Sequence, residues 1–137
     1  MGSIVLNSSL IVDNVSSSLF YSQEEESSLE LYYSTIYNNQ ILSDYYDVFN
    51  VDNVSILNSI IWDVNWNSCE YSQDYLIGYS NIEHYSTLYS ECDIYDVGGN
   101  LLGAPFDNPE FIDSEDGNYM LSDDSPSVDA GYPGNID

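Results

Sequence analysis

Short apolar runs recur along the chain and are separated by longer polar segments. In four of these runs an apolar residue occupies the first and third positions, the spacing at which side chains of a β-strand return to one face. The runs begin at Ile4, Leu29, Val54 and Tyr75, with offsets of 25, 25 and 21 residues. Since no long stretch places apolar residues at i, i+3, i+4 and i+7, the pattern predicts short strands rather than helices.

The aligned runs also share residue types at later positions. The third position is aliphatic, the sixth is serine and the eighth is isoleucine in every run. The three columns contain Leu6, Leu31, Ile56 and Ile77, then Ser9, Ser34, Ser59 and Ser80, then Ile11, Ile36, Ile61 and Ile82. Such a repeat predicts a β-solenoid, in which every coil stacks its residues on the equivalent residues of the next coil about 4.8 Å away.

Stacking would give each column a structural role. The aliphatic columns would form continuous ladders in the core. The serines would make tight corners, where their hydroxyls can bond neighbouring backbone groups. An antiparallel β-sandwich with similar strands is the alternative, because its strands would also bury one face.

Composition agrees with an all-β fold and restricts the partners. The 137 residues include 14 Tyr, 4 Phe and 2 Trp, and aromatic residues favour strands. The chain has 24 acidic residues and neither Lys nor Arg, so its formal net charge is −24. Nucleic-acid phosphates and anionic lipid headgroups are bound through Lys and Arg, so we expect no nucleic acid and no membrane partner. Because dissolved salt or divalent cations relieve self-repulsion, we expect a saline or calcium-containing setting.

Two parts of the chain resemble a known family. Asn58-Ser59-Ile60-Ile61-Trp62 matches an N-S-I-I-W motif that is common in β-helix coils. The segments Asn108–Asp113, Gly117–Leu121 and Ser125–Gly131 are similar, in order, to N-P-x-F-x-D, G-x-Y-x-L and S-P-x-x-D-x-G. In these features the chain resembles the C-terminal portion of right-handed parallel β-helix repeat proteins of the pectate-lyase-like superfamily.

The resemblance implies a fold and a location. We expect an all-β, right-handed parallel β-helix (solenoid) of about four to five coils. Residues 1–103 would form the coils, and residues 104–137 would form an irregular C-terminal cap of the same domain. Phe111, Tyr119, Leu121 and Val128 would cover the open end of the last coil. We expect the chain to be a fragment of a secreted or cell-surface protein, with end-to-end self-association as an option for the uncapped first coil.

Catalytic chemistry finds little support in the sequence. The resemblance implies that lyases of the superfamily use calcium and a basic residue, and this chain has neither Lys nor Arg. His84, the sole imidazole, is either a base or a surface residue. Glycoside hydrolysis requires two carboxylates about 5 to 9.5 Å apart, and the adjacent pair Asp123 and Asp124 falls in the expected cap. We therefore assign no catalytic residue.

Two further groups of side chains have candidate roles. Asp113, Glu115 and Asp116 lie beside a glycine and offer oxygen ligands that suit Ca²⁺, although an acidic turn would have the same composition. Cys69 and Cys92 can form one disulfide or remain two buried thiols.

These observations lead to hypotheses of different classes. The first is a non-catalytic extracellular β-solenoid, a structural or adhesive scaffold with a polysaccharide or cell-surface partner. The second is a fragment that binds or degrades a polysaccharide, with acidic residues and exposed aromatics such as Tyr33, Trp62 and Trp66 on one face of adjacent coils. The third is an acidic mimic that binds a basic partner by charge, with an affinity that falls as salt rises.

Overall fold

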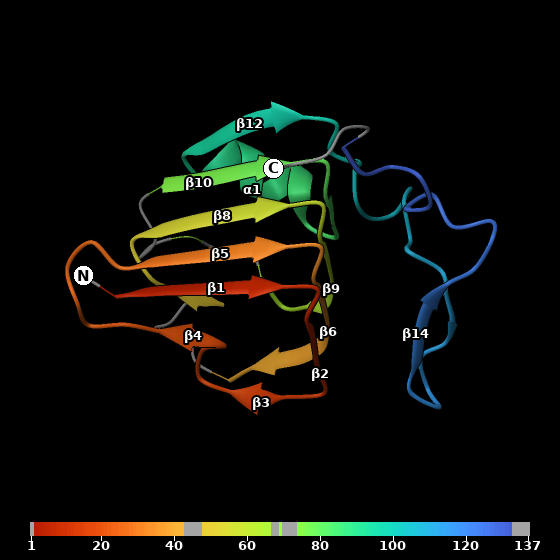
Figure 1. Ribbon diagram of the computed structural model, residues 1–137, viewed down its shortest axis with the longest axis horizontal. Helices are drawn as coiled ribbons and strands as arrows, with labels where there is room; N and C mark the ends of the chain where they lie inside the picture. The colour runs from red at the N-terminus through yellow and green to blue at the C-terminus, as the bar shows by residue number, and fades with distance from the viewer. Residues whose placement is uncertain (1, 43–47, 67–68, 70–73, 133–137) are drawn as a thin grey trace.

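The computed structural model describes residues 2–42, 48–66, 69 and 74–132, and it has an all-β fold (Figure 1). The predicted all-β class is thus confirmed. In the described part of the chain, the one helix is α1 (Tyr85–Glu91), which is far too short to cross a membrane.

Five parallel strands form the first sheet, and each comes from a different repeat. They are β1 (Ser3–Asn7), β5 (Ser28–Tyr32), β8 (Asn53–Leu57), β10 (Asp74–Gly78) and β12 (Ile94–Gly98), in this order across the sheet. Figure 1 shows them one above the other, all pointing the same way. The chain therefore returns to the same face of the molecule once in every repeat.

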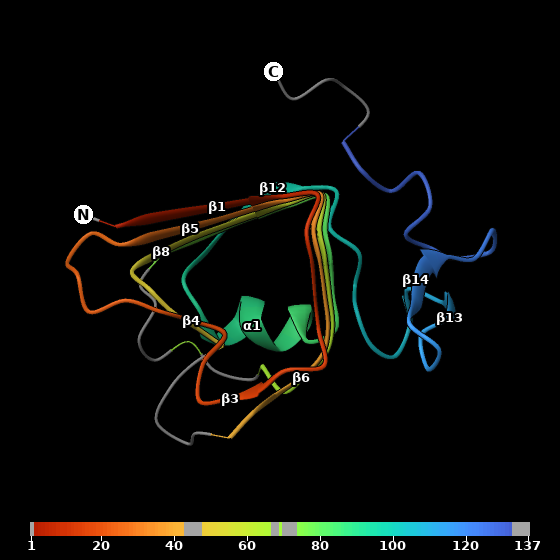
Figure 2. The ribbon, with the colours of Figure 1, turned by 60° about the horizontal axis from the view of Figure 1, so that its bottom comes forward.

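A second parallel sheet follows the first around a corner, as Figure 2 shows. Its strands are β2 (Leu10–Val12), β6 (Thr35–Ile41), β9 (Ile60–Val64) and β11 (Asn81–Ile82). Two further parallel pairings are short. In them β3 (Val15–Ser16) pairs with β6, and β4 (Phe20–Tyr21) pairs with β7 (Phe49–Asn50). An antiparallel hairpin of β13 (Phe111–Asp113) and β14 (Asn118–Leu121) follows later in the chain.

The apolar columns are paired in register across both sheets. In the first sheet the partners run Ile4, Leu29, Val54 and Tyr75, and beside them Leu6, Leu31, Ile56 and Ile77. In the second sheet they run Ile11, Ile36, Ile61 and Ile82. Members in the middle strands are buried, whereas Leu6 and Ile11 are partly exposed because β1 and β2 are edge strands. The core is thus built by stacking like side chains along the repeat direction.

The serine column forms the corner between the two sheets. The residue before each serine (Ser8, Tyr33, Asn58 and Tyr79) has φ of 50°, a left-handed conformation that turns the chain. The Ser34 N–H donates to Ser59 Oγ at 3.2 Å, and the Ser59 N–H donates to Ser80 Oγ at the same distance. Each of these hydroxyls donates in turn to the carbonyl two residues earlier, as Ser59 Oγ does to Leu57 O at 2.9 Å. Corner backbone groups are therefore satisfied from one repeat to the next.

A fifth repeat continues the stack beyond the four aligned runs. Ile94 pairs with Tyr75 and Asp96 pairs with Ile77, so β12 lies where a further strand is needed. Asn100 replaces serine at the corner, because its Oδ1 accepts from the Ser80 N–H at 3.0 Å. The sequence pattern misses this repeat, since Asp96 interrupts the aliphatic column.

The sheets of the described residues do not close into a single tube. They remain several short sheets, and α1 lies at the level of β10 and β12 (Figures 1 and 2). The helix adds Tyr85 and Leu88 to the core. A closed solenoid is thus not seen, because the connections from the second sheet back to the first differ in length from repeat to repeat.

The expected cap lies elsewhere than predicted. The hairpin packs on the outside of the second sheet, where the Phe111 and Tyr119 rings contact Tyr37 of β6 at centroid distances of 5.0 and 5.5 Å. Val128 is exposed. The prediction that these side chains cover the end of the last coil is therefore wrong, because Tyr37 offers the rings an aromatic partner on the side of the stack. Residues 133–137 of the predicted cap lie outside the described residues.

Cys69 and Cys92 form a disulfide, which resolves the two alternatives that the sequence leaves open. The bond joins the connection after β9 to the C-terminal end of α1. It therefore ties the helix to the preceding repeat.

We expect Ser59→Ala to lower the free energy of unfolding by about 1–3 kcal/mol, because it leaves the buried Ser34 N–H without its acceptor. Denaturant unfolding measures this change. The exposed Ser17 provides the control, and Ser17→Ala should stay within about 0.5 kcal/mol of the wild type. Equal effects of the two substitutions would contradict the role of the serine column.

Reduction of the disulfide is expected to lower the free energy of unfolding by about 3 kcal/mol, since the bond closes a loop between residues 23 apart. Thermal unfolding with and without reductant measures the loss. In the unreduced protein, an alkylating reagent should add no mass to either cysteine, and labelling there would contradict the bond.

Candidate functional site

A hollow lies between the serine corner and the C-terminal segment (residues 104–132). We call it the corner pocket, and its volume is about 290 Å³. Tyr33, Asn58 and Tyr79 contribute from the corners of three successive repeats. Asn81 begins β11, and Tyr132 closes the opposite wall from the C-terminal segment. The stacked corners therefore place equivalent positions side by side along one wall.

Two asparagines fix the C-terminal segment against the repeats. Asn81 Nδ2 donates to the Asp107 carbonyl at 2.7 Å and to Ser127 Oγ at 2.8 Å. Asn58 Oδ1 accepts from the Tyr132 N–H at 2.6 Å. Each amide therefore uses one end to anchor the C-terminal segment.

The other end of each amide is buried without a partner among the described residues. These atoms are Asn58 Nδ2, a donor, and Asn81 Oδ1, an acceptor, and both residues line the corner pocket. Asn81 is 2% exposed. A buried polar atom that makes no hydrogen bond costs stability, so the pair marks the pocket as a place where a polar ligand gains more than on open surface.

Aromatic rings form the remaining walls of the corner pocket. The Tyr79 and Tyr132 rings meet edge to face with centroids 4.9 Å apart. Tyr79 also packs on Gly99, where an added Cβ would lie 2.3 Å from the ring. Tyr33 and Tyr132 are about half exposed. The pocket thus has one ring held by its neighbours and two that solvent can reach.

The described residues that line the corner pocket are uncharged. They are tyrosines, serines, asparagines, threonine, glycine and aliphatic residues, with no carboxylate among them. This is unusual for a chain with 24 acidic residues. The pocket therefore suits an uncharged ligand.

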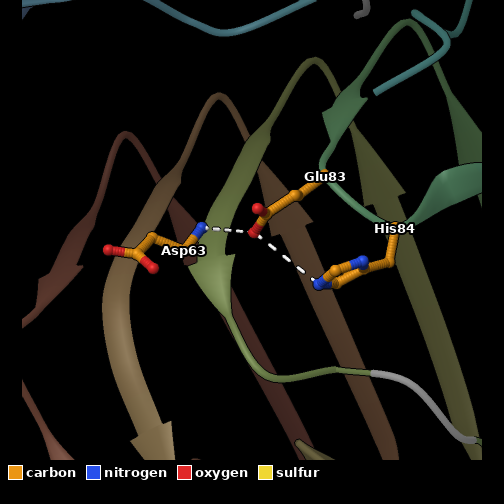
Figure 3. Close-up of polar contacts among 3 residues, drawn as sticks. All are labelled: Asp63, Glu83 and His84. Carbon is orange, nitrogen blue, oxygen red and sulfur yellow. Dashed lines mark hydrogen bonds and ion pairs between the residues drawn. The ribbon is translucent and has the colours of Figure 1, made fainter. Parts of the chain in front are cut away.

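His84 lies on the surface beside a carboxylate. Its Nε2 is 3.7 Å from Glu83 Oε2, and the same oxygen accepts from the Asp63 N–H at 2.8 Å (Figure 3). The Asp63 carboxylate points away from Glu83 in this view. Glu83 thus satisfies the backbone of the neighbouring repeat, and the ion pair forms only when His84 is protonated.

The predicted calcium ligands lie in the turn of the β13–β14 hairpin. Asp113, Glu115 and Asp116 are exposed, and Asp113 Oδ1 accepts from the Asp116 N–H at 3.3 Å. Within the described ranges, no three His, Cys, Asp or Glu side chains gather in a group that could hold a metal ion. The carboxylates act as turn residues in this structure, and calcium binding stays a prediction.

The outer face of the first sheet carries a second hollow, with a volume of about 480 Å³. Asp74, Asp93 and Tyr95 line it across adjacent repeats, and Tyr95 is 72% exposed.

The tryptophans that were expected to form an exposed binding surface do not line this hollow. Trp62 and Trp66 are buried, and the Trp66 ring contacts Phe49 and Tyr75 in the core. The adjacent carboxylates Asp123 and Asp124 are exposed in the C-terminal segment and are not among the residues that line this hollow.

A polar cluster of buried Tyr85, partly buried Asn100 and exposed Asp96 lies at the fifth repeat. Tyr85 Oη donates to Asp96 Oδ2 at 2.6 Å, and Asn100 Nδ2 donates to Asp96 Oδ1 at 2.8 Å. Burial, followed by the hydrogen bond to Asp96, raises the pKa of Tyr85 well above its usual value. The tyrosine therefore stays protonated in the folded protein where a free tyrosine would ionise.

Comparison with known proteins adds no family to these observations. No protein-family model, curated protein or solved structure matches the chain. The resemblance to the pectate-lyase-like superfamily therefore stays a prediction based on the motifs. Asn81 and the corner pocket were not foreseen from the sequence, although Asn58 and Ser59 belong to the N-S-I-I-W motif that the sequence does show.

We expect Tyr85→Phe to lower the free energy of unfolding by about 1.5–3 kcal/mol at pH 8, because it removes a hydrogen bond to a carboxylate. A raised folded-state pKa contributes stability below the unfolded pKa of about 10 and loses it as pH rises further. The advantage of the wild type over the variant should therefore shrink above about pH 10. Denaturant unfolding across this range measures it, with the exposed Tyr89→Phe as control. A constant difference at all pH values would count against this assignment.

Proposed function

We propose that this chain is part of a right-handed parallel β-helix that serves as a non-catalytic structural or adhesive scaffold. The observation that carries the proposal is the stack of five parallel strands, of which the first four pair in register with like residues in each column. In such a stack every repeat supports the next through backbone bonds and packed side chains. The product is a stiff element whose length grows with the number of repeats.

An extracellular or cell-surface location is part of the proposal. Disulfides persist in oxidising compartments such as the outside of the cell, and Cys69–Cys92 is one. A charge of −24 favours solubility and is tolerated best where salt screens it. A polysaccharide or a cell-surface molecule is the partner class that suits this setting.

The non-catalytic part of the proposal rests on how the reactive side chains are used. Glu83 bonds the Asp63 N–H, and His84 faces Glu83. Asp96 accepts hydrogen bonds from Tyr85 and Asn100. These groups hold the repeats together, so we assign them structural roles.

Polysaccharide degradation is the second candidate function. The hollow on the outer face of the first sheet favours it, since Asp74, Asp93 and Tyr95 lie there on adjacent repeats. Glycoside hydrolysis uses a pair of carboxylates, and Asp74 and Asp93 are candidates for such a pair. One experiment can distinguish the scaffold function from polysaccharide degradation.

The test combines hydrogen exchange with an assay for chain cleavage. A scaffold should show slowest exchange in the central strands β5, β8 and β10 and faster exchange in the edge strand β1, because central strands open only with the whole stack. Incubation with neutral and acidic polysaccharides, with and without Ca²⁺, should release no reducing ends and no unsaturated products.

Cleavage would contradict the scaffold proposal if it depended on the outer-face hollow. The matched variants are Asp93→Asn in the hollow and Asp123→Asn in the C-terminal segment, which change the charge equally. Activity that Asp93→Asn abolishes and Asp123→Asn retains would assign the degradative function. Uniformly fast exchange in β5, β8 and β10 would contradict the stacked scaffold itself.

A further inference from the structure

The corner pocket combines features that the scaffold role does not require. We propose that it binds one uncharged sugar unit, held by Asn58 and Asn81 and packed against the tyrosine rings. The site lies on the side of the stack, apart from the hollow that contains Asp74 and Asp93. It would give the scaffold a defined adhesive contact with a neutral glycan.

The two unpartnered amide atoms select the kind of ligand group. Asn58 Nδ2 needs an acceptor and Asn81 Oδ1 needs a donor. A hydroxyl both donates and accepts, so the hydroxyl groups of a sugar are the kind of partner that each of these atoms lacks. The asparagines are already oriented by Tyr132 N–H, Asp107 O and Ser127 Oγ, which reduces the entropy that binding would cost.

The tyrosine rings suit the apolar face of a sugar ring. Tyr79 is held between Gly99 and the edge of Tyr132, whereas Tyr33 and Tyr132 are about half exposed. An aromatic side chain with a polar tip offers both a flat apolar surface and a hydroxyl. The pocket volume of about 290 Å³ is near the lower end of small-ligand sites, which fits one ring rather than a long oligosaccharide.

The charges of the lining and of the whole chain restrict the class of ligand further. No carboxylate stands among the described residues of the lining, so none of these residues favours a cationic ligand. An anionic sugar would be repelled by a chain of charge −24 that has neither Lys nor Arg to pair with it. The ligand is therefore a neutral sugar and not a uronate.

Asn58→Asp is the sharpest variant for this site. It retains Oδ1 for the Tyr132 N–H and tolerates the left-handed backbone, but it replaces the donor Nδ2 by a second oxygen. Asn7→Asp is the matched control, since Asn7 is exposed outside the pocket and the substitution adds the same charge. Tyr132→Ala removes an aromatic wall, and Tyr95→Ala is its control on the outer face of the first sheet.

The experiment is a titration of the full, disulfide-bonded chain, followed by two-dimensional NMR of its backbone and side-chain amides. Glucose, galactose, mannose and N-acetylglucosamine are the neutral probes, and galacturonate is the anionic one. At least one neutral sugar should shift the side-chain amides of Asn58 and Asn81, and galacturonate should not. Asn58→Asp should weaken this binding at least tenfold, whereas Asn7→Asp should leave it unchanged.

Several results would overturn the proposal. They are the absence of neutral-sugar shifts at Asn58 and Asn81, equal binding of galacturonate, and equal affinities of Asn58→Asp and Asn7→Asp. Binding of a neutral peptide in place of every sugar would assign the pocket to a different ligand class. If Asn58→Asp does not fold, the sugar affinities of Tyr132→Ala and Tyr95→Ala are compared instead. Equal affinities of these two variants would overturn the proposal. Hydrogen exchange in the central strands reports on the scaffold independently of these outcomes.

Discussion

The structure depends on how the backbone is satisfied where the chain turns between the two sheets. At the corner the left-handed residue before each serine takes the chain out of one sheet, so the serine N–H needs a partner outside it. The hydroxyl of the next repeat supplies that partner, as Ser59 Oγ does for Ser34. A slip of one residue would remove this hydroxyl and turn every aliphatic side chain outward. The serine column therefore fixes the register on which the buried ladders rest.

The same constraint explains how the stack ends. At the fifth repeat Asn100 takes over as the acceptor for Ser80, and Asp96 stands in the aliphatic column. A carboxylate there would be costly in the middle of the core, but at the end it can be bonded by Tyr85 and Asn100. A polar group at this position thus marks the end of the apolar ladder.

The sequence predicts the parts of the fold that repeat along the chain, and it does not predict the parts that occur once. The columns through Leu31 and Ser34 could be read directly, because stacking requires like residues at a fixed offset. The fifth strand was missed because Asp96 breaks the period. The position of the hairpin was missed because its contact with Tyr37 joins residues far apart in the chain that share no repeat. The corner pocket likewise forms between the repeats and residues of the C-terminal segment, so no local sequence pattern predicts it.

The absence of Lys and Arg makes tyrosine the main side-chain partner of several carboxylates. Tyr32 donates to Glu30 at 2.7 Å, Tyr85 to Asp96 at 2.6 Å and Tyr119 to Asp13 at 3.1 Å. The hydrogen bond to Glu30 raises the pKa of Tyr32, and burial followed by the carboxylate contact raises the pKa of Tyr85 and Tyr119. A phenol needs no counter-charge to make such a bond, so these contacts survive in high salt, where ion pairs weaken. These contacts are therefore less sensitive to salt than ion pairs are, and they are lost when alkali ionises the tyrosine.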